Sequence, residues 1–330
     1  MRLRLAIFSG LGVALALYLV AYVGWRAVFA AAIGIGLGGF AIFCLCGLGL
    51  FFILGAAWHV LMPVSQAISP WIFVRSRMVR DSAAEVLPVS QFGGIASGVR
   101  AAILQGISAP PACASMIVDV TTEMLAQIAY LALGISILTA RVPRTPVVAS
   151  LTSTSVLGLA LAVIAAGLFV AAQRYGRRIT ARLAGPLLRS AQQAATGVSV
   201  ALDEIYRSPL RVTLSVALHF AGWTGSGLGV WLGFRLMGAH VDVAAVLAIE
   251  SLVYATRSAA VLIPNALGVQ EAAYALLAPL FGVGADMALA MSVLKRARDI
   301  VLGVPVLLLW NAAEGRRALA GARLPAGGGS

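Results

Sequence analysis

Charge of either sign is scarce in this sequence. Only 11% of its 330 residues are charged, whereas 61% are hydrophobic. An average soluble chain carries about a quarter charged residues, so a water-exposed surface cannot be built from this composition. The apolar stretches are continuous over about twenty residues or more and do not alternate with polar residues. They therefore predict membrane-spanning helices and exclude both a soluble domain and a β-barrel.

Cysteine is also scarce, and recognisable catalytic motifs are missing. The three cysteines, Cys44, Cys46 and Cys113, lie within or beside apolar stretches and have no zinc or redox spacing. They are interpreted as small buried side chains, and the lone His59 and His219 as interior hydrogen-bonding groups. No nucleophile elbow, phosphate-binding loop or metalloprotease motif is present. We therefore expect no enzyme activity, no cofactor and no metal.

The net charge of +12 comes almost entirely from arginine, since Lys295 is the single lysine. A basic balance can indicate nucleic acid, but these arginines cluster beside apolar stretches and act better as topology signals. They gather in the N-terminal tail, in a predicted loop at 75–80, in a connection at 173–211 and in the C-terminal tail. The positive-inside rule places these regions, and both termini, in the cytoplasm. The large amounts of arginine, alanine and glycine are typical of a GC-rich bacterial genome. We therefore expect the protein to lie in a bacterial inner membrane.

Seven stretches are long enough to cross the apolar core, which requires about 20 helical residues. They are 5–25, 38–60, 112–138, 147–172, 212–234, 243–263 and 287–310. The expected fold is an all-α polytopic membrane protein with about 7–8 transmembrane helices. It forms a single transmembrane domain over 1–312, followed by a flexible tail at 313–330. The connection at 173–211 holds seven arginines and is predicted to contain an interfacial helix.

Two further apolar stretches, 82–105 and 264–284, are interrupted by proline, glycine and a charge. We interpret them as broken or re-entrant helices, with hinges at Pro88, Gly93 and Gly94 in the first and at Pro264 and Gly268 in the second. Irregular backbone at membrane depth is tolerated only inside protein or beside a wet cavity, so both stretches are expected to point inward. Cytoplasmic placement of both termini requires 264–284 to supply a net eighth crossing.

A weak internal repeat relates the two halves of the chain. A shift of 176 residues superimposes Pro88 on Pro264 and Gly106 on Gly282. The same shift places Asp119 on Lys295 and Glu123 on Asp299. Duplicated halves with interrupted segments at matching positions are typical of transporters. The sequence predicts half-repeats around 82–138 and 258–311 in inverted orientation, with Asp119 and Lys295 paired across the two-fold axis.

Several ionisable side chains lie inside or at the edge of the apolar stretches. They are Asp119, Glu123, Glu250, Arg257, Glu271, Lys295, Arg296, Arg298 and Asp299. Each costs at least about 2.5 kcal/mol at a helix centre on insertion scales, so they must face the protein interior, a cavity or a partner. Together they would form a polar cleft that grips a charged or hydroxylated lipid headgroup. The alternative is that they form structural salt bridges that hold helices together.

The stretch SLVYATRSAAVLIPNALGVQEAAYALLAPLFGV resembles the P-G-G-L-G-x-x-E signature of the transmembrane region of lysylphosphatidylglycerol synthases. DSAAEVLPVSQFGGIASGVRAAILQG, followed by IVDVTTEMLAQ, resembles the matching signature of the first half. The best fit is the branch associated with hopanoid biosynthesis. The resemblance implies a lipid flippase-like module without the soluble aminoacyl-transfer domain of some relatives. One departure is Asn265-Ala266, where glycines are usual.

The family motif also carries over onto particular residues. In the second half these are Arg257, Pro264, Gly268, Glu271 and Arg298; in the first half they are Pro88, Gln91, Gly93, Gly94 and Arg100. The prolines and glycines are assigned to the hinges, and the other residues, together with Gln270, to the lipid pathway. The first hypothesis is a protein that translocates or presents a polar-headed lipid, either an anionic phospholipid or a hopanoid-type lipid. A second is a non-catalytic scaffold that recruits lipid-biosynthesis enzymes, and a third is an intramembrane transferase using Asp119 or Glu123 as general base. The oligomeric state stays open.

Overall fold

The computed structural model describes residues 33–63, 68–87, 90–183, 189–260 and 264–321, and every regular element in these ranges is helical. The elements are α3 (Gly36–His59), α4 (Pro70–Val86), α5 (Ser90–Leu104), α6 (Ala109–Arg141), α7 (Pro146–Leu183), α8 (Arg189–Tyr206), α9 (Pro209–Leu236), α10 (Val243–Ala259), η2 (Pro264–Ala266), α11 (Val269–Leu277), η3 (Ala278–Phe281) and α12 (Ala285–Gly321). The predicted span at 5–25 and the end of the predicted tail lie outside the described residues. The expected all-α class is confirmed.

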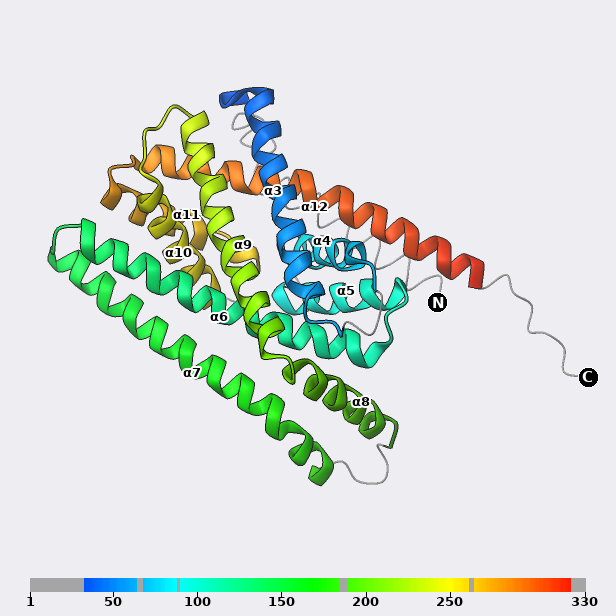
Figure 1. The fold of residues 1–330 in the computed structure, drawn as a ribbon. Helices are drawn as coiled ribbons and strands as arrows, with labels where there is room; N and C mark the ends of the chain where they lie inside the picture. The colour runs from blue at the N-terminus through cyan, green and yellow to red at the C-terminus, as the bar shows by residue number, and fades with distance from the viewer. Residues whose placement is uncertain (1–32, 64–67, 88–89, 184–188, 261–263, 322–330) are drawn as a thin grey trace, which may run out of the picture.

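Three of these helices are long and apolar enough to cross a bilayer: Gly36–His59, Ala109–Arg141 and Pro146–Gln173. They coincide with the predicted spans at 38–60, 112–138 and 147–172. Helix α7 lies along one side of the molecule (Figure 1), and its leucines at positions 157, 161 and 168 are exposed. An exposed apolar surface of this length suits lipid, so the protein is an integral membrane protein. The predicted spans at 212–234 and 287–310 are helical within α9 and α12, and the number of crossings stays a prediction.

Helices α4 and α5 form an antiparallel hairpin. Gly94 on α5 approaches the backbone of α4 so closely that an added Cβ would lie 2.6 Å from the carbonyl oxygen of Arg80. The predicted loop at 75–80 is wrong, because these residues belong to α4. The predicted broken segment starts too early for the same reason, since residues 82–86 complete α4 and the interruption follows them. Phe73, Val79 and Ala83 are buried at helical spacing beside the two arginines, and the carboxylates that the arginines contact offset part of the cost of burying their charges.

Helices α10 and α11 form a second antiparallel hairpin, and the short helix η2 directly precedes α11. Here the backbone takes left-handed values: φ is 50° at Asn265, 45° at Ala266 and 78° at Gly268. Helix α11 has 9 residues, about 14 Å at the helical rise, which is too short to cross a core of about 30 Å. The stretch at 264–284 is therefore broken, as predicted, and α11 alone does not supply the eighth crossing.

The two hairpins pack against the long helices of the opposite half. Helix α4 packs on α12, and helix α10 packs on α6. Helix α9 lies between α3 and α6, and α12 runs across the molecule (Figure 1). The helices α6 and α12 begin at Ala109 and Ala285, each shortly after a glycine with positive φ, Gly106 or Gly282. This arrangement brings the polar residues of both hairpins to the middle of the bundle.

The connection at 173–211 is more helical than a polar loop. Helix α7 continues to Leu183, and α8 occupies Arg189–Tyr206. The apolar residues Ala201, Leu202 and Ile205 of α8 pack on Val118 of α6. The predicted helix in this connection is present, and its apolar face is covered by protein over these residues.

Candidate functional site

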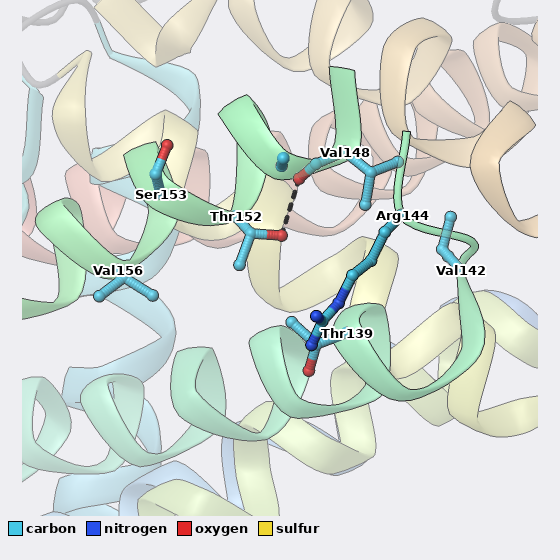
Figure 2. A pocket seen from close by; sticks show the side chains of 8 residues that line it. Thr139, Val142, Arg144, Val148, Thr152, Ser153 and Val156 are labelled. Carbon is cyan, nitrogen blue, oxygen red and sulfur yellow. Dashed lines mark hydrogen bonds between the residues drawn. The ribbon is translucent and has the colours of Figure 1, made fainter. Parts of the chain in front are cut away.

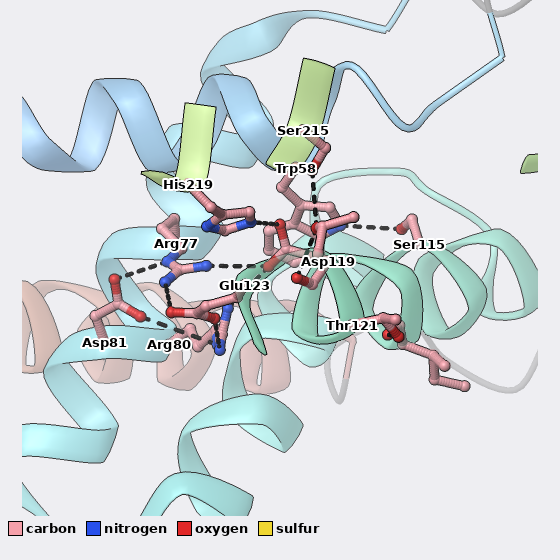
Figure 3. Close-up of polar contacts among 12 residues, drawn as sticks. Trp58, Arg77, Arg80, Asp81, Ser115, Asp119, Thr121, Glu123, Ser215 and His219 are labelled. Carbon is pink, nitrogen blue, oxygen red and sulfur yellow. Dashed lines mark hydrogen bonds and ion pairs between the residues drawn. The ribbon is translucent and has the colours of Figure 1, made fainter. Parts of the chain in front are cut away.

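Two arginines of α4 meet two carboxylates of α6 in the interior. Arg77 donates to Asp119 at 3.0 Å and to Glu123 at 2.7 Å. Arg80 donates to the same two carboxylates at 2.8 and 2.6 Å. The arginines are one turn apart on α4 and the carboxylates one turn apart on α6, so the two pairs face each other as a square. Figure 3 shows this arrangement with Asp81 beside it.

His219 of α9 closes the same group. Its Nε2 lies 3.0 Å from Oδ1 of Asp119, and both side chains are fully buried. One turn earlier on α9, Ser215 shares a hydrogen bond of 2.9 Å with Thr122 of α6. Asp81 accepts from Nε of Arg77 at 2.7 Å. We call Arg77, Arg80, Asp81, Asp119, Glu123 and His219 the Asp119 cluster.

The composition of this cluster corrects two expectations. Asp119 was predicted to pair with Lys295, but it binds Arg77, Arg80 and His219 instead. Sequence reasoning also missed Arg77 and Arg80, because they were counted as topology signals in a loop. Their spacing of three residues on α4, matched to two carboxylates four residues apart on α6, is the signal that would have identified them. His219 is an interior hydrogen-bonding group, as predicted. His59 also forms a hydrogen bond, with the carbonyl of Ile68, but it is only half-buried.

Lys295 is enclosed in the other half of the molecule. Its Nζ lies 2.7 Å from Glu250 Oε2 of α10 and 2.9 Å from the hydroxyl of Tyr274 of α11. The Tyr274 hydroxyl also donates to Glu250. Lys295 is 1% exposed and Glu250 is 0% exposed, so neither reaches solvent or lipid. These three residues, the Glu250 cluster, join α10, α11 and α12 in one contact.

The ends of the two hairpins meet at a third ion pair. Arg257, near the end of α10, donates to both carboxylate oxygens of Glu85, near the end of α4, at 2.9 and 2.8 Å. Asn265 donates to the backbone carbonyl of Glu85 at 2.7 Å and accepts from Arg257. We call Glu85, Arg257 and Asn265 the hairpin junction. It connects residues from opposite halves of the chain.

Glu271 holds the start of α11 and also binds α12. Its carboxylate accepts from the backbone N–H of Gly268 at 2.9 Å and from Nε of Arg296 at 2.5 Å. The first contact satisfies an amide that the helix itself leaves unpaired. Gln270 donates to Ser292 at 2.8 Å, so the motif Gly268 to Glu271 is tied to α12 at two points.

The remaining predicted site residues lie apart from these groups. Arg298 pairs with its neighbour Asp299 at 2.8 Å and lies over the ring of Phe43. Arg100 donates to Glu314 at 2.6 Å on the exposed side of α5 and α12, so the structure does not bring it to the hairpin junction. Gly93 and Gly94 lie within α5 and not at a hinge. Pro88 lies outside the described residues, as do the side chains of Gln91 and Pro264.

Basic and acidic partners are not equally buried. In two of the ion pairs the arginine is the more buried partner: Arg257 is 12% exposed and Arg296 is 6% exposed, whereas Glu85 and Glu271 are each 28% exposed. Asp81, Glu123 and Asp299 are likewise partly exposed. In these five ion pairs the carboxylate is therefore more accessible than the guanidinium group, whereas Asp119 is fully buried.

A separate cavity of about 400 Å³ lies where α6 turns into α7. Figure 2 shows Arg144 beside Thr139 and Val148 in its wall. The predicted lipid-pathway residues are not among those that line it.

Among the residues that the structure describes, no group of histidine, cysteine, aspartate or glutamate could hold a metal ion. Cys44, Cys46 and Cys113 are free thiols of intermediate burial, and so are less enclosed than predicted.

These features define a class of protein: a helical integral membrane protein whose charged side chains are enclosed between two broken hairpins and the long helices of the opposite halves. The chain belongs to the family described as Lysylphosphatidylglycerol synthase TM region, which it matches over residues 3–306. The predicted family is thereby confirmed, while its hopanoid-associated branch stays a prediction. Comparison with curated proteins and with solved structures found no match.

Proposed function

We propose that this protein moves or presents a polar-headed lipid between the two leaflets, as a flippase-like module without catalytic activity. Membership of a family named for the membrane region of a lipid synthase supports a role on lipid. The observation that carries the proposal is the hairpin junction, where Arg257 and Glu85 join the two halves while staying partly exposed. A contact between halves that a ligand can reach is what translocation by alternating access requires.

We assign the partly exposed members of the ion pairs to binding the lipid headgroup. Arg257 would bind an anionic oxygen, since a guanidinium presents paired donors to phosphate or carboxylate. Glu85 and Glu271 would accept from a hydroxyl or amine. Lys295 and Glu250 are paired with each other and enclosed, so we assign them to holding the helices together, and Asp119 is likewise too enclosed to contact a headgroup. This assignment revises the expectation that every intramembrane charge contacts lipid.

We also propose that the two halves are inverted repeats. The order of a helix, a short returning helix and a long helix occurs in α4–α5–α6 and again in α10–α11–α12. The first helix of each unit packs on the long helix of the other, as an exchange about a two-fold axis would produce. Gly106 and Gly282 share a positive φ at the corresponding turn. Rocking of one unit against the other would then open the hairpin junction toward alternate leaflets.

The test is a flipping assay with purified protein in vesicles that contain a trace of an anionic phospholipid labelled on its headgroup. An impermeant reductant destroys only the label in the outer leaflet. Wild type should expose all of the label. Arg257→Ala and Glu271→Gln should slow exposure about tenfold to a hundredfold, the equivalent of one charge-assisted hydrogen bond of about 1.5–3 kcal/mol.

The matched control is Arg141→Ala, because Arg141 forms an ion pair of similar type with Asp242 at an exposed position. It should flip lipid at the wild-type rate. Wild-type rates for both Arg257→Ala and Glu271→Gln would sink the assignment. Vesicles with wild-type protein that move no lipid would favour the scaffold hypothesis, and a chemically changed lipid would favour the transferase.

Two classes of lipid are candidates for the substrate. Resemblance alone points to a hopanoid-type lipid, and an anionic phospholipid fits Arg257 equally well. Comparing lipids by leaflet in cells with and without the gene would separate them. Altered sidedness of one lipid at unchanged total amount identifies the substrate. A missing species with normal sidedness contradicts translocation and indicates a biosynthetic partner.

A further inference from the structure

The Asp119 cluster holds unequal numbers of opposite charges. Three carboxylates, Asp81, Asp119 and Glu123, contact only two guanidinium groups, those of Arg77 and Arg80. Asp119 is fully buried and both arginines are nearly so. Asp81 and Glu123 are 24% and 19% exposed, so the excess negative charge keeps only part of its hydration, which the low-dielectric interior does not replace. One proton bound within the cluster would make it neutral.

His219 is the group built to take part in holding that proton. Its Nε2 faces Asp119 at 3.0 Å. Its Nδ1 is buried without a partner among the residues that the structure describes. A fully enclosed ring with one nitrogen on a carboxylate and the other unpaired is a rare arrangement, since buried polar atoms are nearly always satisfied. A second proton on the ring would therefore be carried on Nδ1.

The charged groups on the neighbouring helices do not correct the imbalance. The ionisable groups carried by the helices that pack against α9 or the cluster include His59 on α3; Arg77, Arg80 and Asp81 on α4; Asp119, Glu123 and Tyr130 on α6; Asp203 and Glu204 on α8; Glu250, Tyr254 and Arg257 on α10; and Lys295, Arg298 and Asp299 on α12. Lys295 is balanced by Glu250, Arg257 by Glu85 and Arg298 by Asp299. Asp203 and Glu204 are exposed. The excess negative charge is thus confined to the Asp119 cluster.

Polar aromatic side chains continue from His219 toward the other half. Trp223 lies one turn further along α9, and its ring contacts Tyr254 with centroids 4.6 Å apart. Lys295 Nζ in turn lies 4.8 Å from the centre of the Tyr254 ring. The indole N–H of Trp223 and the hydroxyl of Tyr130 are buried without partners in the described part of the chain. This row of polar groups connects the Asp119 cluster with the Glu250 cluster.

We propose that the Asp119 cluster is a proton-binding site, in which His219 and Asp119 hold one exchangeable proton, and that uptake and release of this proton drive movement of the lipid. The coupling to lipid movement rests on the proposed function, whereas the proton site does not. Neutralising the cluster favours the closed packing of α4, α6 and α9. Loss of the proton leaves a net negative charge between these helices and favours their separation. Proton binding would then bias the two states as a ligand does.

The binding site is tested by nitrogen NMR on protein labelled with ¹⁵N-histidine in lipid nanodiscs at neutral pH. His219→Gln assigns the signal among the three histidines. Wild type should show His219 with both ring nitrogens protonated. Asp81→Asn leaves two carboxylates against two guanidinium groups, so the ring should become neutral. The control, Glu204→Gln, removes an exposed carboxylate of α8 and should leave the signal unchanged.

A neutral His219 ring in wild type, or an identical ring state in wild type and Asp81→Asn, would overturn the proton site. Glu123→Gln serves as a second variant if Asp81→Asn does not fold, because it restores the same balance. The coupling is tested in the labelled vesicles with a pH difference across the membrane. Wild-type flipping should change severalfold with the gradient, and flipping by Asp81→Asn should not. If the wild-type flipping rate does not depend on the pH gradient, the coupling is overturned but the proton site is not. If the vesicles move no lipid, both the coupling and the proposed function are overturned. In either case the NMR result still decides whether the proton site exists.

Discussion

Individual charges in this protein are stabilised by partners and not by solvent, and the Glu250 cluster is the clearest case. Lys295 and Glu250 are both enclosed, so neither keeps its hydration. Replacing a buried pair by apolar residues is often tolerated, whereas removing one partner leaves the other charge uncompensated. The energetic importance of each charge therefore depends on what remains after it is removed.

We expect Lys295→Met to lower the free energy of unfolding by about 3–5 kcal/mol, because it leaves the buried Glu250 carboxylate without a cation and with the Tyr274 hydroxyl as its remaining partner. The double variant Lys295→Met/Glu250→Leu should recover most of this loss. Denaturation of the purified protein in detergent, followed by tryptophan fluorescence, measures both. The exposed pair Arg141 and Asp242 provides the control, since Arg141→Met should cost no more than about 1 kcal/mol. A single variant as stable as wild type would show that Glu250 finds another partner.

The ionisable candidates could be identified from sequence because a charge inside an apolar stretch is visible without a structure. Glu250, Lys295, Glu271 and Asp119 were all found in this way and are all buried or partly buried. Their partners were not. Arg77 and Arg80 resemble a loop signal in sequence, and Glu85 was not singled out, since a partner is defined by which helices pack together.

At the scale of elements, the second hairpin depends on backbone angles that most residues avoid. Asn265 tolerates the left-handed region, but Ala266 at φ 45° does not, and the family signature has glycine there. A left-handed alanine costs about 1–2 kcal/mol. Asn265 and Ala266, which replace the glycines of the family signature, are therefore the residues with left-handed backbone in the turn that leads into α11.

Ala266→Gly should raise the free energy of unfolding by about 1 kcal/mol, because glycine adopts this conformation without steric strain. Ala273→Gly is the matched control, since Ala273 is equally buried but lies in regular helix α11. That change should lower stability by about 1 kcal/mol. Thermal unfolding of the two variants side by side gives the comparison, and a loss of stability for both would contradict strain at position 266.

The first hairpin depends on close contact between its arms. Gly94→Ala would place a methyl group 2.6 Å from the carbonyl of Arg80, so we expect the arms to separate and stability to fall by about 1–3 kcal/mol. Gly158→Ala provides the contrast, because nothing lies within 4 Å of that position on α7. It should leave stability unchanged or raise it by up to about 1 kcal/mol. The same unfolding assay separates the two, and equal behaviour would argue against tight packing of α4 on α5.

For the whole molecule, the placement of its loops in the membrane is still a prediction. Arginine clusters favour a cytoplasmic location for the α8–α9 turn and the opposite side for the α6–α7 turn. Arg77 and Arg80 no longer support this orientation, since they are enclosed within α4. The arginines at 174–211 and in the two tails still do.

Single cysteines placed at Arg207 and at Arg144, in a protein lacking its three native cysteines, should report opposite sides of the membrane. An impermeant maleimide added to intact cells should label position 144 and not position 207. Both positions are in turns outside the buried core, so the changes should not affect folding. Labelling of both, or of 207 alone, would show that the orientation is wrong.

By itself, the sequence determined that this is a helical membrane protein with two interrupted segments, because apolar length, proline and glycine act locally along the chain. It also identified most of the charges that the interior must accommodate. Only the tertiary structure decided how those charges are paired, which arginines join the interior, and that the two hairpins meet at Glu85 and Arg257. The physical reason is that an ion pair depends on separations of a few ångströms between helices. Those separations are set by packing across the whole bundle and not by spacing in the sequence.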